Sequence, residues 1–156
     1  MGTRREYTQT SQVTRSQVED LMAYNIAVRN YALLTQDEEE LSNALSNMLV
    51  FLKTVGYINT AYFNGNTTIK IAKTVASAII SFIKSNNDNE IETIDEMLMQ
   101  GYWGLHDVKS SFIDNPSWEM VEMTHGVLLF VDEGIKISTS RTNSIDRVKI
   151  NGSWVS

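Results

Sequence analysis

The stretch from Thr67 to Ser85, TTIKIAKTVASAIISFIKS, constrains the fold more than any other part of this sequence. Its polar residues recur every three or four positions, so a helix places them in one narrow line. The apolar residues cover the rest of the circumference, a wider band than the apolar stripe of a surface helix. The pattern predicts a helix at the centre of the domain, with neighbours on several sides. Its lysine and hydroxyl side chains argue against a membrane span.

Size and composition set further limits. A chain of 156 residues has the length of one domain, and such a domain buries about two-thirds of its unfolded surface. No cysteine is present, which excludes disulfides, thiolate metal sites and a cysteine nucleophile. His106 and His125 are the only histidines, so a zinc site would need mostly carboxylate ligands, an uncommon set. We therefore expect no metal and no cofactor.

The net charge of −6 is unevenly distributed along the chain. It is +1 over residues 1–36, −10 over residues 37–134 and +3 over residues 135–156. An acidic body repels phosphates, so general nucleic-acid binding is not expected. The acidic middle and the basic end are complementary, which suggests a head-to-tail assembly of copies.

The first residues, MGTRREYTQTSQ, contain no apolar core of a secretory signal, and we expect a cytoplasmic protein or one built into a particle made in the cytoplasm. Residues 1–13 are polar and without period, which predicts a flexible arm. Arg4, Arg5 and Tyr7 of this arm are candidates for contact with an acidic neighbour. Residues 14–156 are expected to form a single α+β domain.

Three further helices are expected. The first begins at Thr14 or Ser16, where Ser16 and Glu19 have capping-box spacing, and ends near Leu34. The second begins with Glu38, Glu39 and Glu40 and ends near Val55, with Gly56 as its cap. The helix dipole stabilises carboxylates in a first turn, which explains the three glutamates without a catalytic or metal-binding role. The third is a short helix from Glu90 to about Gln100.

Two segments have competing interpretations. A hairpin is one interpretation of the segment YINTAYF at 57–63 followed by Asn64-Gly65, and its second strand would overlap the start of the 67–85 helix. We favour a short strand at 57–63, a turn at 64–65 and then the helix. Gly101-Tyr-Trp-Gly-Leu-His-Asp107 is predicted to form a tight corner packed on the core, with an exposed aromatic face for a partner as the alternative.

Beyond Ser117 the period changes to that of strands. Short β-prone runs between 118 and 155 alternate with turn residues, which predicts an antiparallel meander, although 117–133 remains open between strand and helix. The alternation of apolar and polar residues predicts one buried face and one basic face. The residues of this basic face are Lys136, Arg141, Arg147 and Lys149, with Trp154 beside them. We expect the face to contact a partner.

Motifs for chemistry are weak. Glu119, Glu122 and His125 have the spacing E-x-x-E-x-x-H, but a di-iron helix bundle needs two such motifs. His106-Asp107 resembles a base with an orienting carboxylate, yet neighbours in sequence rarely make that geometry. Asn64-Gly65-Asn66 before a helix is a weak anion-binding signal.

The sequence therefore favours a non-enzymatic structural or assembly protein without catalytic residues. We expect a homo-oligomer or a component of a larger particle such as a phage virion, with contacts through the terminal arm and the C-terminal sheet, and no membrane partner. One alternative is an acidic inhibitor or immunity-type protein that binds a basic macromolecule. Another is a small α+β cup in which helices close a sheet over an apolar ligand.

Overall fold

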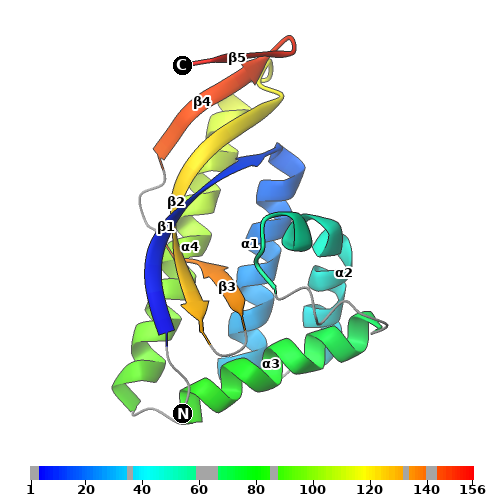
Figure 1. The fold of residues 1–156 in the computed structure, drawn as a ribbon, viewed down its shortest axis with the longest axis vertical. Helices are drawn as coiled ribbons and strands as arrows, with labels where there is room; N and C mark the ends of the chain where they lie inside the picture. Colours follow the sequence, from blue (N-terminus) through cyan, green and yellow to red (C-terminus); the bar gives the residue numbers. More distant parts are fainter. Residues whose placement is uncertain (1–3, 35–36, 59–66, 85–87, 132–133, 140–143) are drawn as a thin grey trace.

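The computed structural model describes residues 4–34, 37–58, 67–84, 88–131, 134–139 and 144–156. The helices are α1 (Arg15–Arg29), its π-helical continuation η1 (Asn30–Leu34), α2 (Glu38–Thr54), α3 (Thr68–Lys84) and α4 (Asp88–Asp114). The strands are β1 (Arg4–Val13), β2 (Met120–Phe130), β3 (Ile135–Ser138), β4 (Ser144–Ile150) and β5 (Ser153–Val155). Helices fill the N-terminal part and most strands lie at the C-terminal end, so the α+β class is confirmed (Figure 1).

Strand β1 is the first correction, because residues 4–13 are not a flexible arm. They pair antiparallel with β2 over their whole length, from Arg4 opposite Phe130 to Val13 opposite Val121. The pattern of a strand is hidden in the sequence because the inner face of β1 holds Gln9 and Ser11 as well as Val13. These polar residues are satisfied by hydrogen bonds to distant parts of the chain.

The sheet is antiparallel but is not a simple meander. Its order is β1-β2-β4-β5, and β3 pairs with the same edge of β2 as β4 does, farther along that strand. Strand β2 runs through Gly126 without interruption, which answers the open question about 117–133 in favour of a strand. A register shift lies between Glu122 and Met123. Asn151 and Gly152, both with positive φ, form the turn between β4 and β5, as expected for Asn-Gly.

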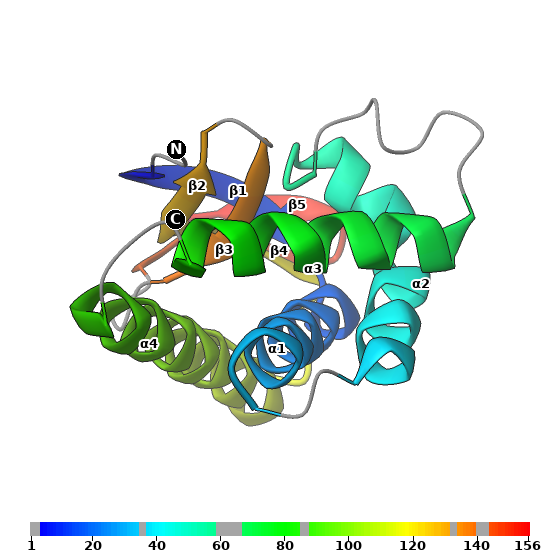
Figure 2. The same ribbon diagram turned by 90° about the horizontal axis from the view of Figure 1, so that it is seen from below.

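Helix α1 is the central helix of the molecule. It lies between α4 and α2 in one layer beneath the sheet, and it also contacts β3 (Figure 2). Its capping box is formed by Thr14 and Gln17, two residues before the expected pair Ser16 and Glu19. The backbone N–H of Gln17 donates to Thr14 Oγ1 at 3.2 Å, and the backbone N–H of Thr14 donates to Gln17 Oε1 at 2.9 Å.

Helix α3 has the expected bounds but not the expected place. It crosses the end of the layer at which α1 continues into η1, and it packs on α2 and η1 (Figures 1 and 2). Among its described side chains, the buried ones are Ile71, Val75 and Ala78, which follow a single line at helical spacing. The ribbon thus places α3 across the outside of the helical layer instead of at its centre (Figure 2).

Helix α4 corrects the predicted corner. Residues 101–107 lie inside this long helix, which begins at Asp88, near the expected Glu90, but does not stop at Gln100. Gly101 faces β3 so closely that a β-carbon there would lie 1.8 Å from the carbonyl oxygen of Ser138. The glycine is therefore needed for close contact between helix and strand rather than for a turn.

The core lies between the helical layer and the sheet. Fully buried side chains come from α1, α2, α4 and the strands, among them Leu21, Leu45, Leu98, Leu105, Val121 and Phe130. The second helix starts at Glu38 as expected, and Gly56 follows it with φ of 72°. No helix in the described part of the chain combines the length and the apolar character that crossing a membrane requires.

Candidate functional site

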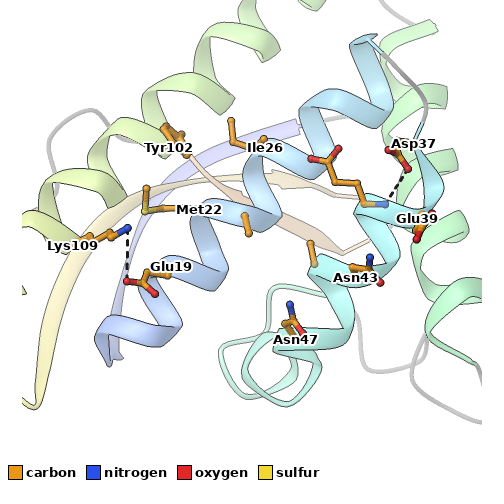
Figure 3. Close-up of a pocket in the computed structure, with 12 residues that line it drawn as sticks. Glu19, Met22, Ile26, Asp37, Glu39, Asn43, Asn47, Tyr102 and Lys109 are labelled. Carbon is orange, nitrogen blue, oxygen red and sulfur yellow. Dashed lines mark hydrogen bonds and ion pairs between the residues drawn. The ribbon is translucent and has the colours of Figure 1, made fainter.

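A groove lies among α1, α2 and α4. Its volume is about 730 Å³ (Figure 3). The lining residues are Glu19, Met22, Ala23, Ile26, Asp37, Glu39, Glu40, Asn43, Ala44, Asn47, Tyr102 and Lys109. The groove is bounded by helices alone, whereas the cup hypothesis places a pocket under the sheet.

Carboxylates dominate the rim of the groove. Asp37, Glu39 and Glu40 come from the start of α2, and Glu19 of α1 lies opposite them. Lys109 is the single basic residue among the described residues of the lining, and its Nζ lies 3.8 Å from Glu19 Oε1. These described residues therefore carry an excess of three negative charges.

Most of these carboxylates have a partner within the chain. Asp37 caps α2 by accepting a hydrogen bond from Glu40 N–H at 3.1 Å, and Glu40 accepts one from the Asn30 amide at 2.9 Å. Glu39 is exposed and has no hydrogen bond or ion pair to any residue that the structure describes. It is the carboxylate of the groove best placed to accept an outside cation.

The floor and one wall of the groove are apolar. Met22 and Ala44 of the lining are buried. Ile26 follows Met22 along α1 on the side that faces the groove (Figure 3). On α4, Tyr102 contacts Trp103 edge to face, with ring centroids 5.3 Å apart, and 53% of Trp103 is exposed. An exposed indole next to an apolar groove is typical of a surface that binds another protein.

A second group of polar residues is buried around His125 of β2. Tyr57 Oη lies 2.7 Å from Ser138 Oγ and 3.3 Å from His125 Nδ1, and Ser11 Oγ lies 3.4 Å from His125 Nε2. Asn25 of α1 donates to the carbonyl of Ser138 at 2.9 Å. We call Ser11, Tyr57, His125 and Ser138 the histidine network.

The histidine network has residue types found in active sites, but it is closed to solvent. No member is more than 7% exposed. Burial lowers the pKa of His125 to about 4, although a backbone hydrogen bond with Gly126 acts in the opposite direction, and burial raises the pKa of the Tyr57 phenol. The neutral imidazole of His125 is therefore enclosed by hydroxyl groups, and a substrate cannot reach it. Its contacts connect β2 with β1, with β3 and with Tyr57 after α2.

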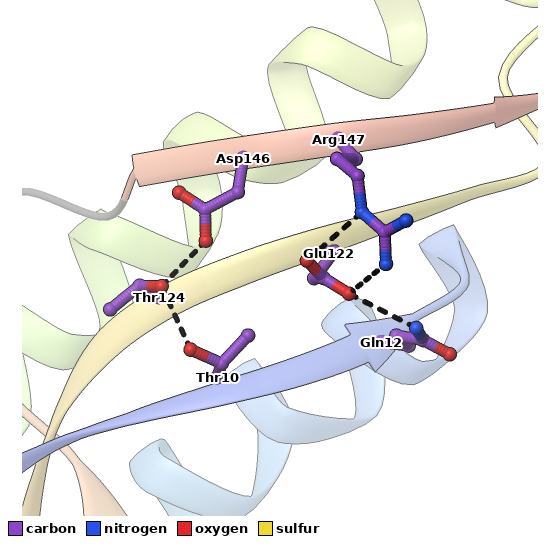
Figure 4. Close-up of polar contacts among 6 residues, drawn as sticks. All are labelled: Thr10, Gln12, Glu122, Thr124, Asp146 and Arg147. Carbon is purple, nitrogen blue, oxygen red and sulfur yellow. Dashed lines mark hydrogen bonds and ion pairs between the residues drawn. The ribbon is translucent and has the colours of Figure 1, made fainter. Parts of the chain in front are cut away.

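The outer face of the sheet holds several of the residues expected to contact a partner. Arg147 of β4 donates to Glu122 Oε1 at 3.1 Å and to Oε2 at 2.6 Å (Figure 4). Its guanidinium also lies 5.0 Å from the centre of the Trp154 ring. The hydrogen bonds from Arg147 lower the pKa of Glu122. Thr124 bonds Thr10 and Asp146 in a neighbouring row. Glu122 thus neutralises Arg147, one residue of the predicted basic face.

The strand register also divides that face in two. Lys136 lies opposite Leu129 of β2, whereas Arg147 and Lys149 lie opposite Glu122 and Met120, which point to the other side of β2. Lys136 instead donates to Gln9 Oε1 at 3.3 Å and lies over the ring of Tyr7. Arg147, Lys149 and Trp154 share one face, and Lys136 does not belong to it. Arg141 lies outside the described residues.

The N-terminal candidates are also separated, because neighbours along a strand point to opposite faces. Arg4 forms an ion pair with Glu6 at 2.9 Å, while Tyr7 contacts Lys136. Arg5 is exposed. Whether any of these residues binds a partner stays a prediction.

The weak motifs find no support from geometry. Glu122 and His125 lie on opposite faces of β2, since Glu122 bonds Arg147 outside and His125 lies in the buried network. His106 packs against Trp103 on α4, with ring centroids 5.3 Å apart. Within the described ranges no three His, Asp or Glu side chains gather closely enough to hold a metal ion. The loop at 64–66 lies outside the described residues.

Sequence reasoning missed the groove. The run Glu38–Glu40 predicts the start of a helix, and the structure confirms it. No local pattern indicates that α1 and α4 lie beside this helix and form a groove with it. Comparison of the chain with protein-family models, with curated proteins and with solved structures gives no match.

Proposed function

We propose that this chain is a non-enzymatic structural protein that assembles with further copies of itself through the groove among α1, α2 and α4. The observation that carries the proposal is the combination of an apolar floor with a rim that has an excess of three negative charges. Such a surface suits a protein partner that offers both apolar contact and cations. The exposed ring of Trp103 beside the groove supports the same use.

The sequence-based form of this hypothesis is more specific. It describes a component of a larger particle such as a phage virion, with contacts through the N-terminal arm and the C-terminal sheet. Because β1 is paired with β2, a contact through residues 4–13 would use the remaining edge of that strand rather than a free arm. The groove is the better supported surface, since ion pairing already neutralises Arg147 on the sheet.

The solution mass of the purified protein tests self-assembly. We expect light scattering to give a mass above that of one chain, rising with concentration and falling at high salt, because salt screens the charge pairs. Ala23→Trp, which places a large ring in the groove from an exposed position, should reduce the mass. A strict monomer at every concentration would contradict the proposal.

The second candidate is an inhibitor or immunity-type protein that uses the same groove for a basic macromolecule. The excess of carboxylates on the rim favours it equally. It differs in the measured mass, because the protein alone would be a monomer. Binding to a basic protein such as lysozyme or cytochrome c, used as probes, would then be salt-sensitive and lost in Glu39→Lys.

A further inference from the structure

Helix α3 carries a basic outer stripe that is complementary to the groove. Lys70, Lys73, Thr74, Ser77 and Ser81 are exposed and follow one side of the helix. The helix has three lysines and no carboxylate over its length. It lies nearest the viewer in Figure 2, on the outside of the molecule. None of the described residues that line the groove belongs to α3, and none of the residues of the stripe lines the groove.

The stripe on α3 can match both the apolar floor and the carboxylate rim of the groove. A lysine side chain has an apolar stem and a charged end, so its stem can cover Met22 and Ala44 while its ammonium reaches the carboxylates of the rim. Glu39 has no partner among the described residues and is available to one ammonium. The second ammonium can approach Asp37, whose carboxylate shares the same end of α2.

The size of the groove limits what it can hold. A helix about 10 Å in diameter that rises 1.5 Å per residue occupies roughly 120 Å³ per residue. A volume of about 730 Å³ therefore corresponds to about six residues, or less than two turns, and not to the whole of α3. Lys70, Lys73 and Thr74 lie within five consecutive residues and are all exposed.

We propose that residues 70–74 of α3 in one copy dock into the groove among α1, α2 and α4 of the next copy. This inference rests on the proposed self-assembly and names its contact. The two surfaces differ, so the contact is heterologous: each copy uses its groove for one neighbour and its α3 for another. Repetition then gives a closed ring or an open filament.

Charge reversal on α3 is the first test, read by light scattering. Lys70→Glu with Lys73→Glu should weaken association at least about tenfold, since like charges would face each other. The matched control is Val50→Glu with Lys53→Glu and Thr54→Glu, which lowers the net charge by the same four units at exposed positions of α2 outside the groove lining. The control should keep the wild-type mass. Equal loss in both charge variants would overturn the proposal.

Complementation is the decisive test. The Ala23→Trp variant keeps a normal α3, and the α3 double variant keeps a normal groove. Each alone should be a monomer, and an equimolar mixture should form a dimer of two chains that grows no further. Circular dichroism and thermal unfolding of each variant establish that it is folded before the mixture is measured.

The outcomes separate the two proposals. If wild type forms an oligomer that either variant preserves, self-assembly stands and docking of α3 in the groove is wrong. If the two variants are monomers but their mixture stays monomeric, the contact is not heterologous and the inference is also wrong. If wild type is a monomer at every concentration, the proposed self-assembly fails, and this inference fails with it.

Discussion

Gly101 of α4 lies against the backbone of Ser138 of β3: a β-carbon on Gly101 would lie 1.8 Å from the Ser138 carbonyl oxygen and 2.7 Å from Asn25 Nδ2. The same carbonyl accepts the hydrogen bond from Asn25. Three elements therefore meet at a glycine that lies in mid-helix, where alanine would otherwise be preferred by about 1 kcal/mol.

Gly101→Ala should destabilise the protein in spite of that helix preference. The added methyl group overlaps backbone atoms, which cannot move aside as a flexible side chain can, and we expect a loss of about 3 kcal/mol in urea unfolding. Gly152→Ala is the control, because nothing lies within 4 Å of its added β-carbon and only its positive φ is strained. Its loss should be about 1 kcal/mol. A gain in stability for Gly101→Ala would show that α4 can move away from β3.

Acid should destabilise the fold through His125. Its pKa is about 4 in the folded chain, while an unfolded histidine has a pKa near 6.5. The unfolded state therefore takes up the proton first as pH falls. Stability from this group is complete above pH about 6.5 and is lost as pH decreases toward 4, by about 3 kcal/mol in total.

Urea unfolding at several pH values between 7 and 4.5 measures this effect. His125→Gln should have a shallower loss of stability with acid than wild type, although its stability at pH 7 is lower. His106→Gln is the matched control for the removal of a histidine, since His106 lies outside the histidine network. If the two variants change the pH profile equally, the assignment to His125 is wrong.

Tyr57→Phe should reveal the value of the histidine network. It removes a buried hydroxyl that lies 2.7 Å from Ser138 Oγ and leaves that oxygen and His125 Nδ1 without this partner. We expect a loss of about 1–3 kcal/mol in chemical unfolding. Tyr102→Phe at the half-buried groove wall should stay within about 0.5 kcal/mol of wild type. A neutral Tyr57→Phe would imply that the network contributes no net stability.

Deletion of residues 1–13 should abolish cooperative folding instead of removing an accessory arm. The deletion leaves β2 without its ten-residue partner strand, exposes the space filled by Val13 and removes Ser11 from His125. Deletion of residues 153–156 is the control, because β5 is short and largely exposed. Thermal unfolding followed by circular dichroism compares the two. If the variant without residues 1–13 has a melting temperature within a few degrees of wild type, these residues are an accessory arm and not part of the folded core.

Local signals in the sequence determined much of this fold. The run from Glu38 to Glu40 located the start of α2, Gly56 located its end, and the three-and-four spacing from Thr67 located α3. Asn151-Gly152 located the last hairpin. Each of these signals depends on residues close together in the chain, where capping, helix period and turn conformation are decided.

Tertiary structure alone decided the rest, because the deciding contacts join distant residues. Ser11 and His125 are 114 positions apart, and only their pairing makes a strand of the polar residues 4–13. The register of β2 with β3 and β4 separates Lys136 from Arg147, although alternation along each strand treats them alike. The groove exists because α1, α2 and α4 pack side by side, and no local period encodes which helices become neighbours.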